Sequence, residues 1–228
     1  SMGAKYAVLV AKHCTGFCIW PTRAHDYSVK SSPWRNGEGD IVADFIKSCR
    51  KFNIRPGIYY SVSANGYLKV DNPGKVISGD PKEQEAYNKT VELQVTELWT
   101  GYGELFEIWF DGGALPPEQG GPDIAALLAK YQKNAVCFQG PLGHPSLVRW
   151  VGNEDGRADY PCWSTTKILK DDTGPENPGA QYGAGDPEGE VWAPAEADMP
   201  NRHPRSNGGG WFWKAGEDDQ VFSLEYLM

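Results

Sequence analysis

The stretch FEIWFDGG, residues 106–113, is an apolar run that ends on a carboxylate, Asp111, which two glycines follow. An apolar run of this length is typical of a buried strand. A carboxylate at the edge of an apolar core is costly unless another group needs its charge. The stretch therefore predicts a strand whose last side chain has a chemical role. Without side chains, Gly112 and Gly113 would let a ring approach that carboxylate.

Strand-like and helix-like segments alternate on both sides of this stretch. We expect strands at residues 5–13, 54–61, 105–111, 135–140, 147–154, 190–196 and 209–213. We expect helices at 40–52, with Asp40 as N-cap, at 81–102, with Pro81 in the first turn, at 122–132, and from 217 onward. Residues 62–80 are predicted to form a long loop, and 155–190 a second, Gly/Pro/Asp-rich one. This alternation is that of parallel β/α units, and the apolar strand segments are typical of strands buried on both faces.

Polar side chains stand at the carboxyl ends of several predicted strands. They are His13, Tyr59 or Tyr60, Asp111, Glu154 and Glu196. In a β/α barrel, the carboxyl ends of the strands converge on one face, and that face holds the active site. The sequence therefore predicts an α/β fold of the (β/α)8, or TIM-like, barrel type.

Composition excludes several classes of partner. The chain has 22 basic and 30 acidic residues among 228, and this net charge of −8 argues against nucleic acids and anionic membranes. We expect no signal peptide within the given residues and no membrane span, since no apolar run reaches the length that a span needs. Five cysteines at irregular spacing form no disulfide framework or zinc pattern. Nine tryptophans and eleven tyrosines suit either core packing or sugar binding.

Asp111 and Glu154 are two carboxylates at different strand ends. Paired carboxylates with a sugar between them are the apparatus of glycoside hydrolysis. One is ionised, and the other holds a proton because burial or its neighbour raises its pKa. Taken alone, a strand-end aspartate is more often a structural or metal-binding residue. The two-carboxylate mechanism requires no metal or cofactor.

Eight blocks in this order resemble the family 29 α-L-fucosidases, above all the plant-like and bacterial branch that cleaves branched α-1,3/1,4-fucosides. They are AKHCTGFCIWPT (11–22), DYSVKSSPWRNGEGDIV (26–42), GIYYS (57–61), EIWFDGG (107–113), RWVGNEDG (149–156), CWSTT (162–166), VWAPAEAD (191–198) and GWFW (210–213). The blocks run nearly from end to end of the chain. No single block would be specific, but their order is.

The resemblance implies a retaining exo-α-L-fucosidase with Asp111 as the nucleophile and Glu154 as the acid/base, Glu196 being the second choice. It implies sugar contacts from His13 and from Tyr59 or Tyr60, and Cys14 stands where the family has a second histidine. Trp211 and Phe212 match an aromatic wall for the fucose methyl group. Trp109 flanks the nucleophile, and Trp20 would either bind sugar or fill the interface between barrel and helices.

The family barrel has a strand before residue 5, with a His-Trp pair, and a strand after the last helix, and we expect both to be missing here. We therefore expect one incomplete barrel domain over 1–228, with no C-terminal β-sandwich. Its open edges would close into a smaller barrel or pair with a second copy of the chain. The expected partner is a fucosylated oligosaccharide or glycoconjugate. By resemblance, the protein would be secreted, periplasmic or lysosomal.

Two other functions stay open. One is a non-catalytic or weakly active relative that binds fucosylated glycans. The missing strands and the change at Cys14 favour it. The other is an unrelated sugar-phosphate enzyme, which would need a Gly-rich phosphate loop near the last strands. The segment NGGGW (207–211) is a weak signal for such a loop.

Overall fold

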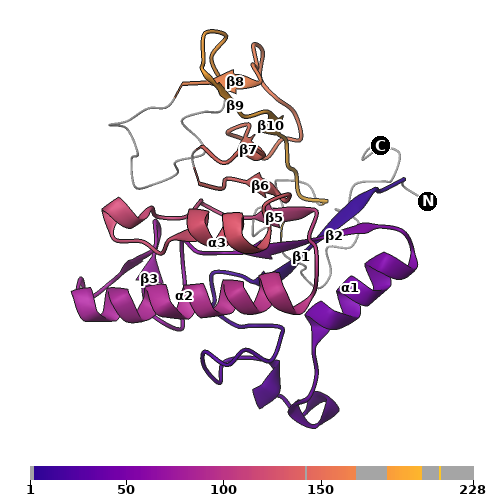
Figure 1. Cartoon of the computed structure of the whole chain (residues 1–228), viewed down its shortest axis with the longest axis vertical. Helices are drawn as coiled ribbons and strands as arrows, with labels where there is room; N and C mark the ends of the chain where they lie inside the picture. Colours follow the sequence, from indigo (N-terminus) through magenta and orange to yellow (C-terminus); the bar gives the residue numbers. More distant parts are fainter. Residues whose placement is uncertain (1–2, 142, 168–183, 202–210, 212–228) are drawn as a thin grey trace, which may run out of the picture.

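The computed structural model describes residues 3–141, 143–167, 184–201 and 211. Its centre is a parallel sheet of six strands in the order β1-β2-β5-β6-β7-β10 (Figure 1). The strands are β1 (Tyr6–Lys12), β2 (Arg55–Tyr60), β5 (Glu107–Trp109), β6 (Val136–Phe138), β7 (Leu147–Trp150) and β10 (Ala195–Glu196). The order follows the chain, as successive β/α units of a barrel require.

Three helices connect the first strands, where the sequence predicts them. They are α1 (Ile41–Lys51), α2 (Pro81–Gly101) and α3 (Ile124–Tyr131), and short 3-10 turns occur at η1 (Val29–Ser31), η2 (Trp34–Gly37) and η3 (Pro117–Gln119). Each helix begins after an aspartate whose side chain accepts a hydrogen bond from a first-turn N–H. The predicted N-cap Asp40 and the first-turn position of Pro81 are confirmed.

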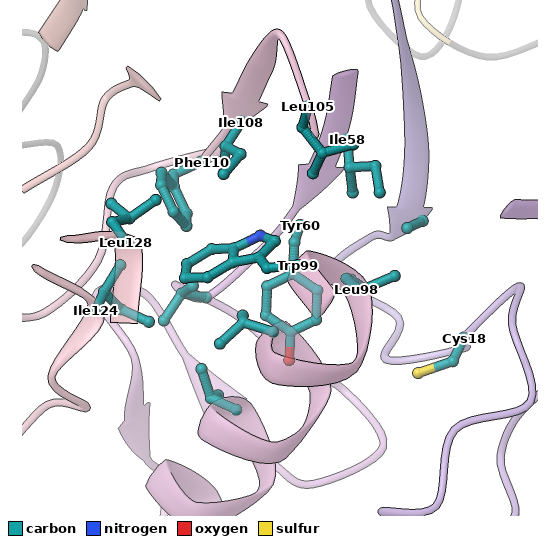
Figure 2. Packing of buried hydrophobic residues seen from close by; sticks show 14 of the residues in the cluster. Cys18, Ile58, Tyr60, Leu98, Trp99, Leu105, Ile108, Phe110, Ile124 and Leu128 are labelled. Carbon is teal, nitrogen blue, oxygen red and sulfur yellow. The ribbon is translucent and has the colours of Figure 1, made fainter. Parts of the chain in front are cut away.

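Strand alternation divides the sheet into a helix face and an opposite face. On the helix face, Ile58 and Tyr60 of β2 and Ile108 of β5 are fully buried together with Phe110, just beyond β5. They pack against apolar side chains of the helices, including Leu98, Trp99 and Leu128 (Figure 2). Trp99 meets Phe110 edge to face, with ring centroids 6.3 Å apart. The odd-numbered side chains of the same strands therefore point to the other face.

Phe110→Ala is expected to destabilise the chain by about 3–5 kcal/mol, because a fully buried ring leaves a cavity when it is removed. The matched control is Phe52→Ala, whose ring is 67% exposed and whose effect should stay within about 0.5 kcal/mol. Urea denaturation followed by circular dichroism measures both. Equal free energies of unfolding for the two variants would contradict the assignment of Phe110 to the core.

Three segments differ from the prediction, and one of them is the predicted loop 155–190, which contains the short strand β8 (Thr165–Thr166). The predicted loop 62–80 contains an antiparallel hairpin, β3 (Val70–Asp71) with β4 (Lys75–Val76). The predicted single strand 190–196 is two short strands. β9 (Val191–Trp192) pairs with β8, and β10 pairs with β7. Pro194 lies between them, and it has no N–H to donate to a continuous ladder.

The end strands β1 and β10 do not pair with each other within the described residues, so the described sheet is an incomplete β/α barrel. The expectation that β1 is buried on both faces is wrong for this sheet. Tyr6 is 39% and Val10 45% exposed. The strand and helix predicted at 209–213 and from 217 onward lie outside the described residues, except for Trp211. None of the described helices is both long and apolar enough to cross a membrane.

Candidate active site

A cavity of about 940 Å³ lies on the face of the sheet opposite the helices. Its lining combines acidic and aromatic side chains from every strand of the sheet and from the segments that follow them. The acidic ones are Glu107, Asp111, Glu154, Glu196 and Asp198, and the rings are Tyr6, His13, Tyr59, Trp109, Phe138, Trp150 and Trp211. The predicted meeting of strand ends is therefore present for His13, Tyr59, Asp111, Glu154 and Glu196.

Asp111 follows β5 and turns its carboxylate toward this cavity. The hydroxyl of Tyr59 donates to Asp111 Oδ2 over 2.6 Å. Ser63 Oγ donates to the main-chain oxygen of Asp111, also over 2.6 Å, so both ends of the residue are held. His13 Nε2 lies 4.0 Å from Asp111 Oδ2, and the Asp111 side chain is 51% exposed. The carboxylate is therefore fixed and accessible at once.

The two glycines after Asp111 allow the turn that exposes it. Gly112 has φ +71° and Gly113 φ +75°, a region that side chains disfavour. A Cβ at Gly112 would lie 2.9 Å from Ser63 Oγ, the atom that holds the Asp111 main chain. The glycines are thus required by the turn itself.

Tyr59 acts on Asp111 as a neutral hydrogen-bond donor. Burial raises the pKa of its phenol far above the usual value, and the charge of Asp111 raises it further. The sequence left Tyr59 and Tyr60 as alternatives for this position, and the structure separates them. Tyr60, one residue on, faces the helices and donates to Gln94.

Four rings from adjacent strand ends, near Asp111, stack one on the next. Phe138 lies on Trp109 with centroids 3.9 Å apart and planes at 4°. Trp109 lies 5.2 Å from Tyr59, and Tyr59 lies 5.7 Å from His13, both nearly parallel. We call Phe138, Trp109, Tyr59 and His13 the aromatic row. Because each ring face lies against the next ring, the row lines the cavity mainly with ring edges.

Three further carboxylates each accept a hydrogen bond from an indole N–H. Trp211 Nε1 donates to Glu154 Oε2 over 2.8 Å, and Trp109 Nε1 donates to Glu196 Oε1 over 3.0 Å. Asp198 Oδ1 accepts from Trp150 Nε1 over 2.7 Å. Burial raises the pKa of Asp198, and its indole bond works against that rise.

Two predicted sugar-binding residues lie in the core and not at the cavity. Trp20 is 2% exposed and donates to Glu97 on α2, which fits the alternative that it fills the interface between sheet and helices. Tyr60 lies in the core because strand alternation turns it away from Tyr59.

Cys14 is exposed, with its Sγ 3.0 Å from Nδ1 of His13, and it is not among the cavity-lining residues. Phe212 lies outside the described residues.

Six polar or aromatic residues of the lining were not singled out from the sequence: Tyr6, Glu107, Phe138, Gln139, Trp150 and Asp198. Strand alternation is the signal that could have found two of them. Glu107 stands four residues before Asp111, and Asp198 two residues after Glu196, so each shares a face with a residue already singled out.

The fold and the site together define a class of protein. Carboxylates above aromatic rings at the carboxyl ends of parallel strands are the arrangement of barrel-type glycoside hydrolases. The family profile described as Alpha-L-fucosidase matches residues 1–145. The chain belongs to the α-L-fucosidase family, as the eight sequence blocks predict.

Individual relatives agree with this assignment. Alpha-L-fucosidase 1 of Arabidopsis thaliana is 36% identical over 227 residues, which cover 94% of this chain and 39% of the plant protein. A crystal structure of a putative alpha-L-fucosidase from Bacteroides thetaiotaomicron is 37% identical, with a TM-score of 0.82, over all of this chain and 52% of that one. A Ruminococcus gnavus GH29 fucosidase solved in complex with fucose is 28% identical, with a TM-score of 0.63, over 94% of this chain and 45% of that one. The chain thus spans about half the length of these proteins, or less.

Proposed function

We propose that the protein is a retaining exo-α-L-fucosidase, which hydrolyses terminal α-L-fucose from oligosaccharides or glycoconjugates through a covalent fucosyl-enzyme intermediate. One observation carries the proposal beyond the family. The Asp111 carboxylate is accessible in the cavity, with one oxygen bound by the neutral phenol of Tyr59. The half-exposed carboxylate is therefore accessible for attack on an anomeric carbon.

In this mechanism Asp111 attacks the anomeric carbon while an acid protonates the leaving oxygen, and water then cleaves the fucosyl ester. We propose Glu154 as the acid, which becomes the base in the second step. It lies in the exposed segment after β7 and lines the same cavity as Asp111. With substrate bound, we expect the two carboxyl groups to stand roughly 5–5.5 Å apart, as retention requires.

Recognition of the sugar falls to the remaining groups around the cavity. His13 Nε2 is close enough to Asp111 to share a sugar hydroxyl with it. The edges of the aromatic row line the space for the sugar ring, and Trp211 offers a wall for its methyl group. Fucose is the ligand of the Ruminococcus gnavus structure, and we propose the same sugar for this chain.

A second function has a specific observation in its favour. The end strands β1 and β10 of the described sheet leave unpaired edges, and the chain covers 39% of its plant relative. Such a chain would bind fucosylated glycans with little or no turnover. Its open edges would pair with a second copy, since unpaired strand edges seek partners.

An aryl α-L-fucoside assay of the purified chain tests both functions. We expect release of the aryl group from the fucoside and none from an aryl β-D-galactoside, which serves as the control. Saturable binding of L-fucose without turnover would favour the second function. Neither binding nor turnover, from a chain that is folded by circular dichroism, would overturn both. Light scattering on the same sample shows whether the edges pair.

A further inference from the structure

Glu107 is a buried carboxyl group that the proposed mechanism does not use. It begins β5, and alternation places Glu107, Trp109 and Asp111 in one column on the cavity face. Glu107 is 1% exposed, whereas the Asp111 side chain is half exposed. The column therefore runs from a fully buried carboxyl group at Glu107 to a half-exposed one at Asp111.

The contacts of Glu107 are with another acid. Its Oε1 is buried and has no hydrogen-bond partner among the described residues. Its carboxyl group lies close enough to that of Glu196 for a hydrogen bond once one of the two is protonated, and Glu196 Oε1 accepts from Trp109 Nε1. A hydrogen bond between two carboxyl groups needs a proton on one of them.

The neighbouring strands supply no cation to Glu107 within the described residues. Beside it in the sheet are Gly57 of β2 and Val136 of β6. Two other titratable groups lie near it, Tyr6 of β1 and Cys137 of β6; burial raises the pKa of both, and an ionised Glu107 would raise them further. Burial first, and then the charge of Glu196, raises the pKa of Glu107 to about 8. Two ionised carboxylates are not stable together in such a site, so Glu107 keeps its proton at neutral pH.

We propose that Glu107 is a positioning residue of the site, a carboxylic acid that donates its proton to Glu196 and so holds Glu196 as the acceptor for the indole of Trp109. Trp109 is a member of the aromatic row, and the row includes Tyr59, which binds Asp111. Loss of the proton puts two like charges side by side, and the contact that fixes the indole weakens. The inference rests on the proposed function only in the kcat/KM measurements; the emission and Tm measurements are independent of it.

Stability gives a readout that needs no catalysis. The unfolded chain releases this proton at roughly pH 4.3, whereas the folded chain holds it to about pH 8. The folded state therefore binds the extra proton between these values. The free energy of unfolding contributed by Glu107 falls as pH rises across that window and levels off above it.

The experiment compares wild type, Glu107→Gln and Glu107→Leu, with Glu97→Gln as control. Glu97 is a carboxylate on α2 outside the cavity, held by Trp20, Thr22 and Arg23. Tryptophan emission and Tm are recorded from pH 5 to 10. In wild type and in Glu97→Gln we expect an emission transition near pH 8 and a Tm contribution that falls up to about pH 8 and levels off above it. We expect neither in Glu107→Gln or Glu107→Leu. Glutamine keeps an N–H donor for Glu196, so Glu107→Gln should also keep the wild-type emission of pH 7.

If the chain turns over fucosides, kcat/KM of wild type at pH 9 should be about tenfold lower than at pH 7, because a proton is lost near pH 8. It should keep falling above pH 9. Glu107→Gln should remove this alkaline fall and stay near wild type at pH 7, whereas Glu107→Leu should be slower at every pH. A pH 8 transition that persists in Glu107→Gln would overturn the proposal. So would a Glu107→Leu variant that matches wild type in emission, Tm and rate. If no turnover is found at all, the emission and Tm titrations still decide.

Discussion

Asp111→Asn is expected to lower fucoside turnover by at least about 10³-fold, because the amide cannot attack the anomeric carbon. The change is nearly isosteric, and Tyr59 O–H can still donate to the amide oxygen that replaces Oδ2. The Tm should therefore stay close to that of wild type. Initial rates on an aryl α-L-fucoside and thermal unfolding measure the two effects.

The control is Asp26→Asn, which also removes one negative charge but at a side chain that is 90% exposed. It should leave the rate unchanged. Asp111→Gly in the presence of azide adds a positive test, since a small anion can occupy the vacated space and form a fucosyl azide of inverted configuration. Wild-type turnover by Asp111→Asn would show that another group is the nucleophile.

Glu154→Ala is expected to slow natural fucosides by about 10²–10⁴-fold, the usual contribution of a general acid. An aryl fucoside with an activated leaving group hardly needs a proton, so the fucosylation step on it should be far less affected. Parallel kcat/KM measurements on a fucosyl oligosaccharide and on the activated fucoside give this difference. If the loss of kcat/KM in Glu154→Ala does not depend on the leaving group, Glu154 is not the acid/base.

Glu196→Ala is the matched comparison, because Glu196 lies in the same cavity but is bound to Trp109 Nε1. We expect similar losses on both substrates for this variant, through the displaced indole. A leaving-group dependence in Glu196→Ala and none in Glu154→Ala would exchange the two roles. Trp211→Phe removes the donor to Glu154 Oε2 but keeps an aromatic wall, and it should cost less than Glu154→Ala.

The local elements could be predicted from the sequence because their signals are local. The aspartates at 40, 80 and 123 cap helices that an apolar period already marks, and the hydrogen bonds to Ala43, Lys82 and Ala126 span two or three residues. The place of Asp111 just after β5 was readable in the same way, since an apolar run meets a charge and then two glycines. The barrel type followed from the alternation of these elements.

Only the tertiary structure decided which face each side chain occupies. Tyr59 and Tyr60 are adjacent and chemically alike, and their roles separate because β5 beside β2 fixes the direction of both. Trp20 is a core residue because Glu97, 77 positions away, binds its indole. Glu107 becomes an acid facing an acid only when β10 arrives near it from residue 195 onward. The local sequence shows the alternation of a strand, but it does not show which strands and helices lie beside it. Those neighbouring elements determine how buried each side chain is, which charges surround it and which group it binds.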